Sequence, residues 1–208
     1  MAAPAALRLR KAPRQRRAVH TVDALLEAAA LVLEADGLEG FNTNAVARRA
    51  GASVGSLYQY FPSKEALTLA LMLREKRQFY DALLGAVALP DCRDALTRLV
   101  DLCARQQLTR PHLARLLDQE EARPEFRAAL SDGSSFRSML ASILGKPGAP
   151  PHLCDDEPRR RLAADDLAAL IRGMTDAAGE RGERDVEDLA YRIGAAVFGY
   201  LAAPPRQM

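Results

Sequence analysis

Aromatic residues and long apolar runs are scarce in this sequence. Tryptophan is absent from its 208 residues, and aromatic residues make up only 5% of the chain. β-Sheets draw heavily on aromatic and β-branched residues, and no segment alternates apolar with polar residues as a half-buried strand would. No segment approaches the roughly 18 uninterrupted apolar residues that a membrane-spanning helix needs. The sequence therefore predicts an all-α protein with no membrane partner.

Cysteine is also rare. Cys92, Cys103 and Cys154 are odd in number and widely spaced, which disfavours a disulfide framework. His152 lies close to Cys154, but no second pair of Cys or His residues completes a zinc site. No apolar stretch follows the basic N-terminal residues, as a secretory signal would require. We expect no metal, no cofactor and a cytoplasmic location. The thiols are then incidental, with redox or metal sensing as the alternative.

Charge is balanced overall but unevenly placed. The chain carries a formal net charge of +2. Residues 1–64 hold nine Lys and Arg residues against five acids, whereas the remaining 144 residues hold 20 against 22. Six of the nine cations fall within the first 17 residues. A basic arm on a weakly acidic body indicates contact with a polyanion. From charge alone, a solvated tail is an equal alternative.

Ala- and Leu-rich segments punctuated by Gly and Pro predict helices through most of the chain. The expected helices cover residues 13–36, 43–50, 54–60, 63–88, 91–108, 111–121, 124–144, 158–179 and 184–202. The Asp132–Gly133 pair is expected to break or kink the seventh of these, and residues 145–158 form the clearest loop.

The two short helices have the pattern of a helix-turn-helix. Thr43 is expected to cap the first helix, and Ser53 the second. Gly51 falls where the chain must turn with a positive φ, which glycine adopts without steric cost. The expected inward side chains are Val46, Ala47, Ala50, Leu57 and Phe61. The outward side chains of the second helix are then uncharged, which favours contact with base edges in a major groove.

Residues 50–67, AGASVGSLYQYFPSKEAL, resemble the motif of TetR family transcription regulators, whose usual form is A-G-V-S-x-G-[ST]-[LI]-Y-x-[HY]-F-x-[SN]-K-E-x-L. Ala52 departs from it, since Val is common there. The resemblance implies an all-α fold of about nine helices. It implies a flexible basic arm at 1–12, a DNA-binding domain at 13–62, and an effector-binding and dimerisation domain at 63–208.

The resemblance also implies roles for single residues at the DNA. Those at family positions that bind phosphates are Thr43, Ser53, Tyr58, Tyr60 and Lys64. Those at positions over the base edges are Val54, Gly55, Ser56 and Gln59. Gln59 suits adenine, and the absence of Lys or Arg at position 54 implies less guanine recognition there. A mainly structural role for Tyr60 is the alternative.

The last two helices carry apolar stripes that the resemblance assigns to a homodimer interface. The expected interface residues are Leu167, Ile171, Met174, Ile193, Val197 and Tyr200. The alternative is that these residues form ordinary core within one chain.

An effector pocket is expected by family analogy among the middle helices. Its candidate lining residues are Tyr80, Cys103, Gln107, His112, Leu116, Gln119, Phe136 and Met139. Residues of these types are more often plain core than pocket, which is the alternative, and their apolar bias favours a hydrophobic or amphipathic ligand.

The expected function is therefore a repressor that binds double-stranded operator DNA at the nucleoid and leaves it when a small effector binds. A ligand-independent architectural DNA-binding protein is one alternative. An enzyme is another, but no phosphate-binding loop, metal-ligand set or nucleophile elbow is present. No catalytic residue is assigned.

Overall fold

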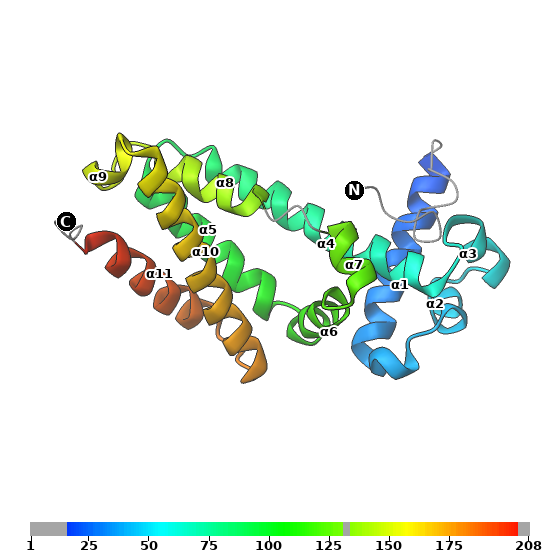
Figure 1. Ribbon diagram of the computed structural model, residues 1–208. Helices are drawn as coiled ribbons and strands as arrows, with labels where there is room; N and C mark the ends of the chain where they lie inside the picture. Colours follow the sequence, from blue (N-terminus) through cyan, green and yellow to red (C-terminus); the bar gives the residue numbers. More distant parts are fainter. Residues whose placement is uncertain (1–15, 131–133, 204–208) are drawn as a thin grey trace. The chain divides into compact units, whose positions relative to one another are not determined.

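The computed structural model describes residues 16–130 and 134–203 (Figure 1). Within these residues every regular element is a helix, as the composition predicts, and no helix among them is both long and apolar enough to cross a membrane. The chain divides into two compact units. The first holds the described residues up to Arg77 and those from Arg115 to Leu130, and the second holds the rest.

The first unit begins with α1 (Arg16–Gly40), which is followed by α2 (Thr43–Arg49) and α3 (Val54–Tyr60). The predicted stripe of α1 is confirmed, because Leu25, Ala28, Ala29, Val32 and Leu33 are all buried. The helical backbone breaks at Gly37, where φ is 65°. This left-handed conformation, which favours glycine, explains why the first helix effectively ends where the sequence predicts. Phe41 is buried beneath that end, as expected.

The first half of α4 (Lys64–Val87) also belongs to this unit, together with α7 (Pro124–Leu130) and most of α6 (Pro111–Glu121). Leu69 and Met72 of α4 pack against Phe126 and Leu130 of α7 in a small apolar core. The Lys76 ammonium donates a hydrogen bond to the Leu130 carbonyl at the end of α7. A segment more than forty residues further along the chain is thus packed onto the helix that follows the helix-turn-helix.

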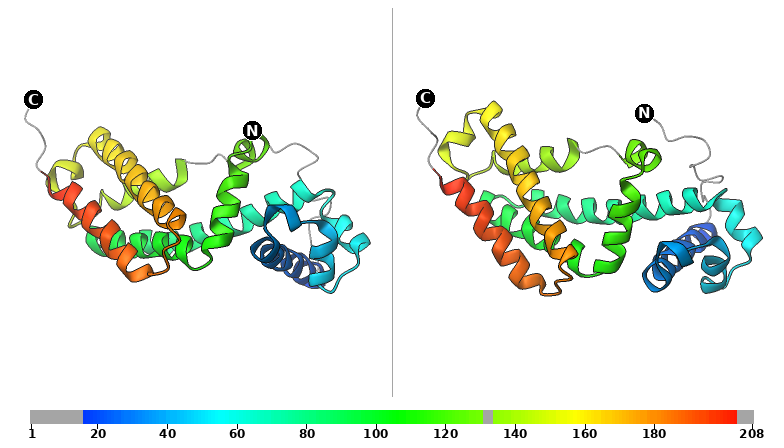
Figure 2. Two further views of the ribbon diagram at one scale, coloured as in Figure 1. Left: turned by 90° about the horizontal axis from the view of Figure 1, so that it is seen from below. Right: turned by 60° about the horizontal axis from the view of Figure 1, so that its bottom comes forward.

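The second unit is built from α5 (Cys92–Leu108), α8 (Ser134–Ile143), α9 (Pro151–Cys154), α10 (Glu157–Glu180) and α11 (Val186–Ala202), with the end of α4. α10 packs on α8, α5 and α11, and α11 also packs on α5. Figure 2 shows α10 and α11 side by side along much of their length. Their shared core includes Leu96 and Leu99 of α5 and Leu167 of α10, all fully buried.

Eleven helices lie in the described residues, against about nine expected. One addition is α9, a single turn inside the predicted loop that begins at Pro151, a residue whose fixed φ suits the first position of a helix. The other arises because the segment 124–144 contains two helices, α7 and α8. The residues between them, where a break was expected, lie outside the described residues, as does the predicted basic arm at 1–12.

Candidate nucleic-acid interface

The first helix of the helix-turn-helix is capped one residue earlier than predicted. Asn42, not Thr43, is the N-cap of α2, and its side-chain oxygen accepts a hydrogen bond from the Ala45 amide at 2.9 Å. Both residue types satisfy the free amides of a first turn, so the sequence alone does not separate them. Because Asn42 caps α2, the Thr43 hydroxyl is available for another contact.

The turn and the second helix follow the prediction closely. Gly51 has a φ of 65°, and the Ala52 amide donates to the Ala47 carbonyl at 2.9 Å. The Ser53 hydroxyl accepts from the Ser56 amide at 3.0 Å and so caps α3. Leu57 is fully buried on the inner side of α3. Val46, Ala47 and Phe61 are buried as expected, whereas Ala50 is only half-buried.

The outer face of α3 is uncharged and open. Gly55, Tyr58 and Gln59 are exposed, and Val54, Ser56 and Tyr60 are half-buried. A Cβ atom added at Gly55 would meet only the Ser53 hydroxyl oxygen, at the ordinary contact distance of 3.8 Å. Nothing within the described chain therefore requires glycine at this position.

Thr43 at the start of α2 and Tyr58 in α3 bring their hydroxyl groups together, with 3.2 Å between the two oxygens. The side chain of Tyr58 is 40% exposed. Because one hydroxyl donates to the other, the bonded pair keeps one O–H that can donate to an anion. This is the chemistry expected of groups that hold a DNA phosphate.

Lys64, at the first turn of α4, is half-buried and faces the end of α1. Its ammonium lies 3.5 Å from the Leu38 carbonyl oxygen and 5.4 Å from the centre of the Phe41 ring. An ammonium carries three donors, so one contact with Leu38 leaves others for a phosphate. The sequence did not indicate this contact, because 26 residues separate the two positions.

The candidate pocket residues are divided between the two units. Tyr80, Phe136 and Met139 pack against the core of the second unit that contains the buried Cys103. The Phe79 ring lies 5.9 Å from that of Tyr80 and 6.5 Å from that of Phe136. In the same unit Gln107 packs against Gly179, and His112 is exposed. Leu116, which is buried, and Gln119, which is exposed, belong to the first unit.

Four of the six candidate interface residues lie inside the chain's own core. Leu167, Ile171, Ile193 and Val197 are at most 2% exposed, so their side chains pack within the chain and are not free for a partner. Met174 is half-buried. Tyr200 is 39% exposed, and its hydroxyl donates to the Asp166 carboxylate at 2.6 Å. Burial and the neighbouring Asp166 raise the pKa of Tyr200 to about 12.

Two of the three thiols, Cys92 and Cys103, are buried where the thiolate is disfavoured. Burial raises the pKa of Cys103 to about 12, and burial with nearby Asp91 raises that of Cys92 to about 11. No group of three or more His, Cys, Asp or Glu side chains with the geometry of a metal site occurs in the part of the chain that the structure describes.

Comparison with known proteins agrees with the geometry of the interface. Residues 25–71, which include α2 and α3, match the family model described as bacterial regulatory proteins of the tetR family. No curated protein sequence shows significant similarity to the chain.

Three solved structures illustrate the likeness in fold. A TetR-like transcriptional regulator from Rhodococcus sp. RHA1 is 21% identical, with a TM-score of 0.68 over 93% of this chain and 100% of that one. A putative transcriptional regulator from Pseudomonas aeruginosa PAO1 is 22% identical, with a TM-score of 0.71 over 91% and 94%. The fatty acid degradation regulator FadR from Bacillus halodurans is 18% identical, with a TM-score of 0.72 over 88% and 97%.

α2, the capped turn and the open, uncharged face of α3 form a helix-turn-helix, the motif with which many DNA-binding proteins enter the major groove. The segment around this motif is therefore similar to the tetR family model, and the chain shares its all-helical fold with solved structures of transcriptional regulators.

Proposed function

We propose that this protein is a repressor that binds a palindromic operator as a homodimer and is released by a small apolar or amphipathic effector. The observation that carries the proposal is the outer face of α3. It offers a glycine, small hydroxyl groups and one amide, while the phosphate-binding groups lie beside it. A helix of this kind enters the major groove without a bulky or acidic side chain in the way.

The proposed contacts divide by chemistry. The Thr43–Tyr58 pair, Ser53, Tyr60 and Lys64 hold phosphates and so set the register of the protein on DNA. Val54, Gly55, Ser56 and Gln59 lie over base edges and read sequence. The amide of Gln59 pairs with adenine through two hydrogen bonds, and Val54 contacts a thymine methyl group.

The homodimer is proposed through the exposed sides of α10 and α11. Because much of the apolar stripe is used within the chain, the partner would meet the neighbouring residues instead. These are Leu162, Ala169 and Gly173 on α10, with Tyr191, Ala195, Gly199 and Tyr200 on α11, all exposed. A Cβ atom at Gly173 or Gly199 would meet nothing within 4 Å. Glycine inside a helix costs about 1 kcal/mol relative to alanine, and close approach of a partner helix would explain both.

The effector pocket is proposed within the second unit, around the aromatic group of Phe79, Tyr80 and Phe136. Its apolar walls support an apolar ligand. Two structures similar in fold are named as regulators of fatty acid degradation and, putatively, of fatty acid metabolism. Fatty acids are therefore the first ligands to test.

A reporter assay and a ligand screen test the proposal together. A duplex selected by the protein from a random pool is placed between a promoter and a reporter gene, and expression should fall when the protein is present. Fatty acids that bind should raise the melting temperature and lower operator affinity. Binding without any loss of operator affinity would refute the release step. Unchanged expression would refute repression.

A further inference from the structure

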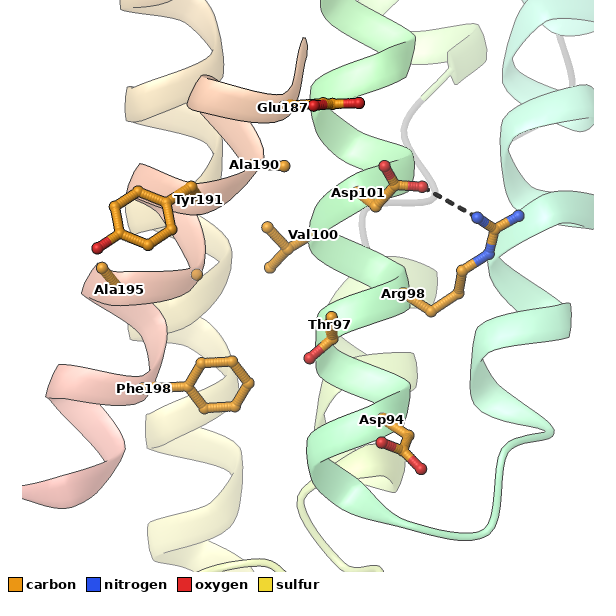
Figure 3. A pocket seen from close by; sticks show the side chains of 11 residues that line it. Asp94, Thr97, Arg98, Val100, Asp101, Glu187, Ala190, Tyr191, Ala195 and Phe198 are labelled. Carbon is orange, nitrogen blue, oxygen red and sulfur yellow. Dashed lines mark hydrogen bonds and ion pairs between the residues drawn. The ribbon is translucent and has the colours of Figure 1, made fainter.

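The second unit has a groove of about 710 Å³ between α5 and α11 (Figure 3). Tyr191 and Ala195 line it, and both lie on the exposed side of α11 that belongs to the proposed homodimer face. A second copy of the chain would therefore cover this groove. In the first unit, by contrast, two serine side chains beside the DNA-binding face contact each other in a way that limits what they can recognise.

Ser53 and Ser56 form a hydrogen-bonded pair at the start of α3. The Ser56 amide donates to the Ser53 hydroxyl oxygen at 3.0 Å, and the two hydroxyl oxygens lie 2.8 Å apart. One hydroxyl therefore donates to the other. Ser53 is exposed, and its hydroxyl oxygen is the only atom that a Cβ atom at Gly55 would meet within 4 Å. The pair is thus open to a molecule that approaches the outer face of α3.

Only one O–H group of this pair remains for an external partner. Each hydroxyl has one proton and two lone pairs. If Ser56 donates to Ser53, the Ser53 oxygen accepts two hydrogen bonds and its own O–H is free, while Ser56 keeps only lone pairs. If Ser53 donates instead, its O–H is used and Ser56 keeps the free one. The two serines therefore cannot both donate outward.

A phosphate at Ser53 would fix the direction of this hydrogen bond. Phosphate oxygens accept hydrogen bonds, so Ser53 can hold a phosphate only through its O–H. Ser56 must then donate to Ser53, and towards the DNA it can only accept. In the major groove, adenine and cytosine present an amino group that donates, whereas guanine and thymine present a carbonyl oxygen that accepts. Ser56 then favours the amino group and disfavours the carbonyl oxygen.

We propose that Ser56 recognises the amino group of an adenine or a cytosine, and that Ser53 enforces this choice by accepting the Ser56 proton while it holds a phosphate. Ser53 is then a positioning residue for sequence recognition, although it touches no base. The inference rests on the proposed function and deepens it, since it names the class of base that one residue of the DNA-binding face selects.

The same two bonds also cap α3, and a purely structural role gives a different result. Loss of a cap alone would weaken binding to every duplex by the same factor and leave the preference at each base pair unchanged. Ser53→Gly removes the hydroxyl with little loss of capping, because glycine is accepted at an N-cap. Ser53→Asn is the matched control. Its side-chain oxygen can accept both bonds from Ser56, and its amide can donate to a phosphate.

Selection of duplexes from a random pool by the full chain, followed by competition titrations with single-base changes, tests the proposal. The position that Ser56 reads is the one whose preference is lost in Ser56→Ala. There the unsubstituted protein should prefer adenine or cytosine over guanine or thymine, on one strand, by about tenfold. Ser53→Gly should reduce this preference to about twofold or less, and Ser53→Asn should retain it. The preference that is lost in Gln59→Ala should be unchanged in both Ser53 variants.

A change in the DNA gives a second readout that does not depend on how a variant folds. Replacing the preferred base by its analogue without the amino group should weaken binding of the unsubstituted protein several-fold and leave binding of Ser56→Ala unchanged.

A preference for guanine or thymine at this position would overturn the proposal. So would an unchanged preference in Ser53→Gly, the same loss of affinity for every duplex in that variant, or unaltered preferences in Ser56→Ala. Any of these results alongside an enriched operator would leave the proposed function intact. If the unsubstituted protein enriches no sequence at all, the proposed function fails together with this inference.

Discussion

At the scale of single residues, the hydroxyl pair of Thr43 and Tyr58 is central to the proposed grip on the DNA backbone. Neither hydroxyl is charged, so the pair should contribute hydrogen bonds without releasing counter-ions. Lys64 should contribute through charge. Removing these groups therefore has different consequences for affinity and for its dependence on salt.

Tyr58→Phe should weaken binding to operator and random duplexes by the same factor, about fivefold, with an unchanged salt slope. Lys64→Ala should also weaken both, but it should lower the slope of log affinity against log salt by about 0.9, the value for one phosphate contact. Anisotropy titrations at several salt concentrations measure both quantities. An unaltered slope in Lys64→Ala would mean that this lysine serves only the contacts with Leu38 and Phe41.

Gln59→Ala should act on sequence preference instead. The exposed amide is proposed to recognise one adenine, so its loss should reduce discrimination at that base pair by about 1–3 kcal/mol. Affinity for random DNA should change little. Competition titrations with operators substituted at each position measure the effect, and a uniform loss at every position would contradict the assigned role.

At the scale of elements, Gly51 and Gly55 offer a matched pair within one motif. Gly51 has a φ of 65°, whereas Gly55 lies inside α3 with open space around it. Gly51→Ala should therefore destabilise the fold by about 1–2 kcal/mol through backbone strain. Gly55→Ala should leave stability unchanged or slightly higher and weaken DNA binding, because its methyl group meets the groove. Denaturant unfolding and anisotropy separate the two effects, and full DNA binding by Gly55→Ala would contradict close approach at this position.

The helix ends and turns that depend only on neighbouring residues could be predicted from the sequence. The left-handed turn at Gly51 and the cap at Ser53 are fixed by residues within four positions of them. The cap at Asn42 was misplaced by one residue because Asn and Thr offer the same chemistry. The contact of Lys64 with Leu38 could not be predicted, since it depends on how α4 packs against the end of α1.

At the scale of the whole molecule, the sequence predicted which helices carry apolar stripes. It could not predict which residues of each stripe are buried within the chain and which are exposed to a partner. Leu167 and Ile193 could face a partner or the core, and only packing against α5 and α8 decides between them. The exposed glycines of α10 and α11 are what now direct the dimer proposal.

Gly199→Leu should convert the proposed dimer to a monomer. A Cβ atom there has open space within the chain, so the fold should survive while the partner helix is excluded. Gly85→Leu, on α4 with equally open space, is the matched control and should stay dimeric. Sedimentation velocity at micromolar concentration distinguishes the two species. A wild-type monomer, or a dimer that tolerates Gly199→Leu, would contradict the proposed interface.

The thiols should report the integrity of the second unit. Burial raises the pKa of Cys103 to about 12 and is the main cause that raises the pKa of Cys92 to about 11. At pH 8 both should stay protonated and resist iodoacetamide, while the half-buried Cys154 reacts. Above the usual thiol pKa of about 8.5, unfolded thiols ionise before the folded ones, so the free energy of unfolding should fall as pH rises. Mass spectrometry of the labelled protein shows which thiols have reacted. Rapid labelling of Cys103 in the native protein would contradict the expected protection.

The claim that α3 reads DNA as one half of a symmetric dimer is tested most directly by selecting duplexes from a random pool. We predict enrichment of an inverted repeat whose half-site centres are one helical turn, about 10 base pairs, or a multiple of it apart. The Gln59→Ala variant should relax both half-sites at the same symmetric position. Enrichment of single, unpaired half-sites, or no enrichment above random DNA, would contradict the account.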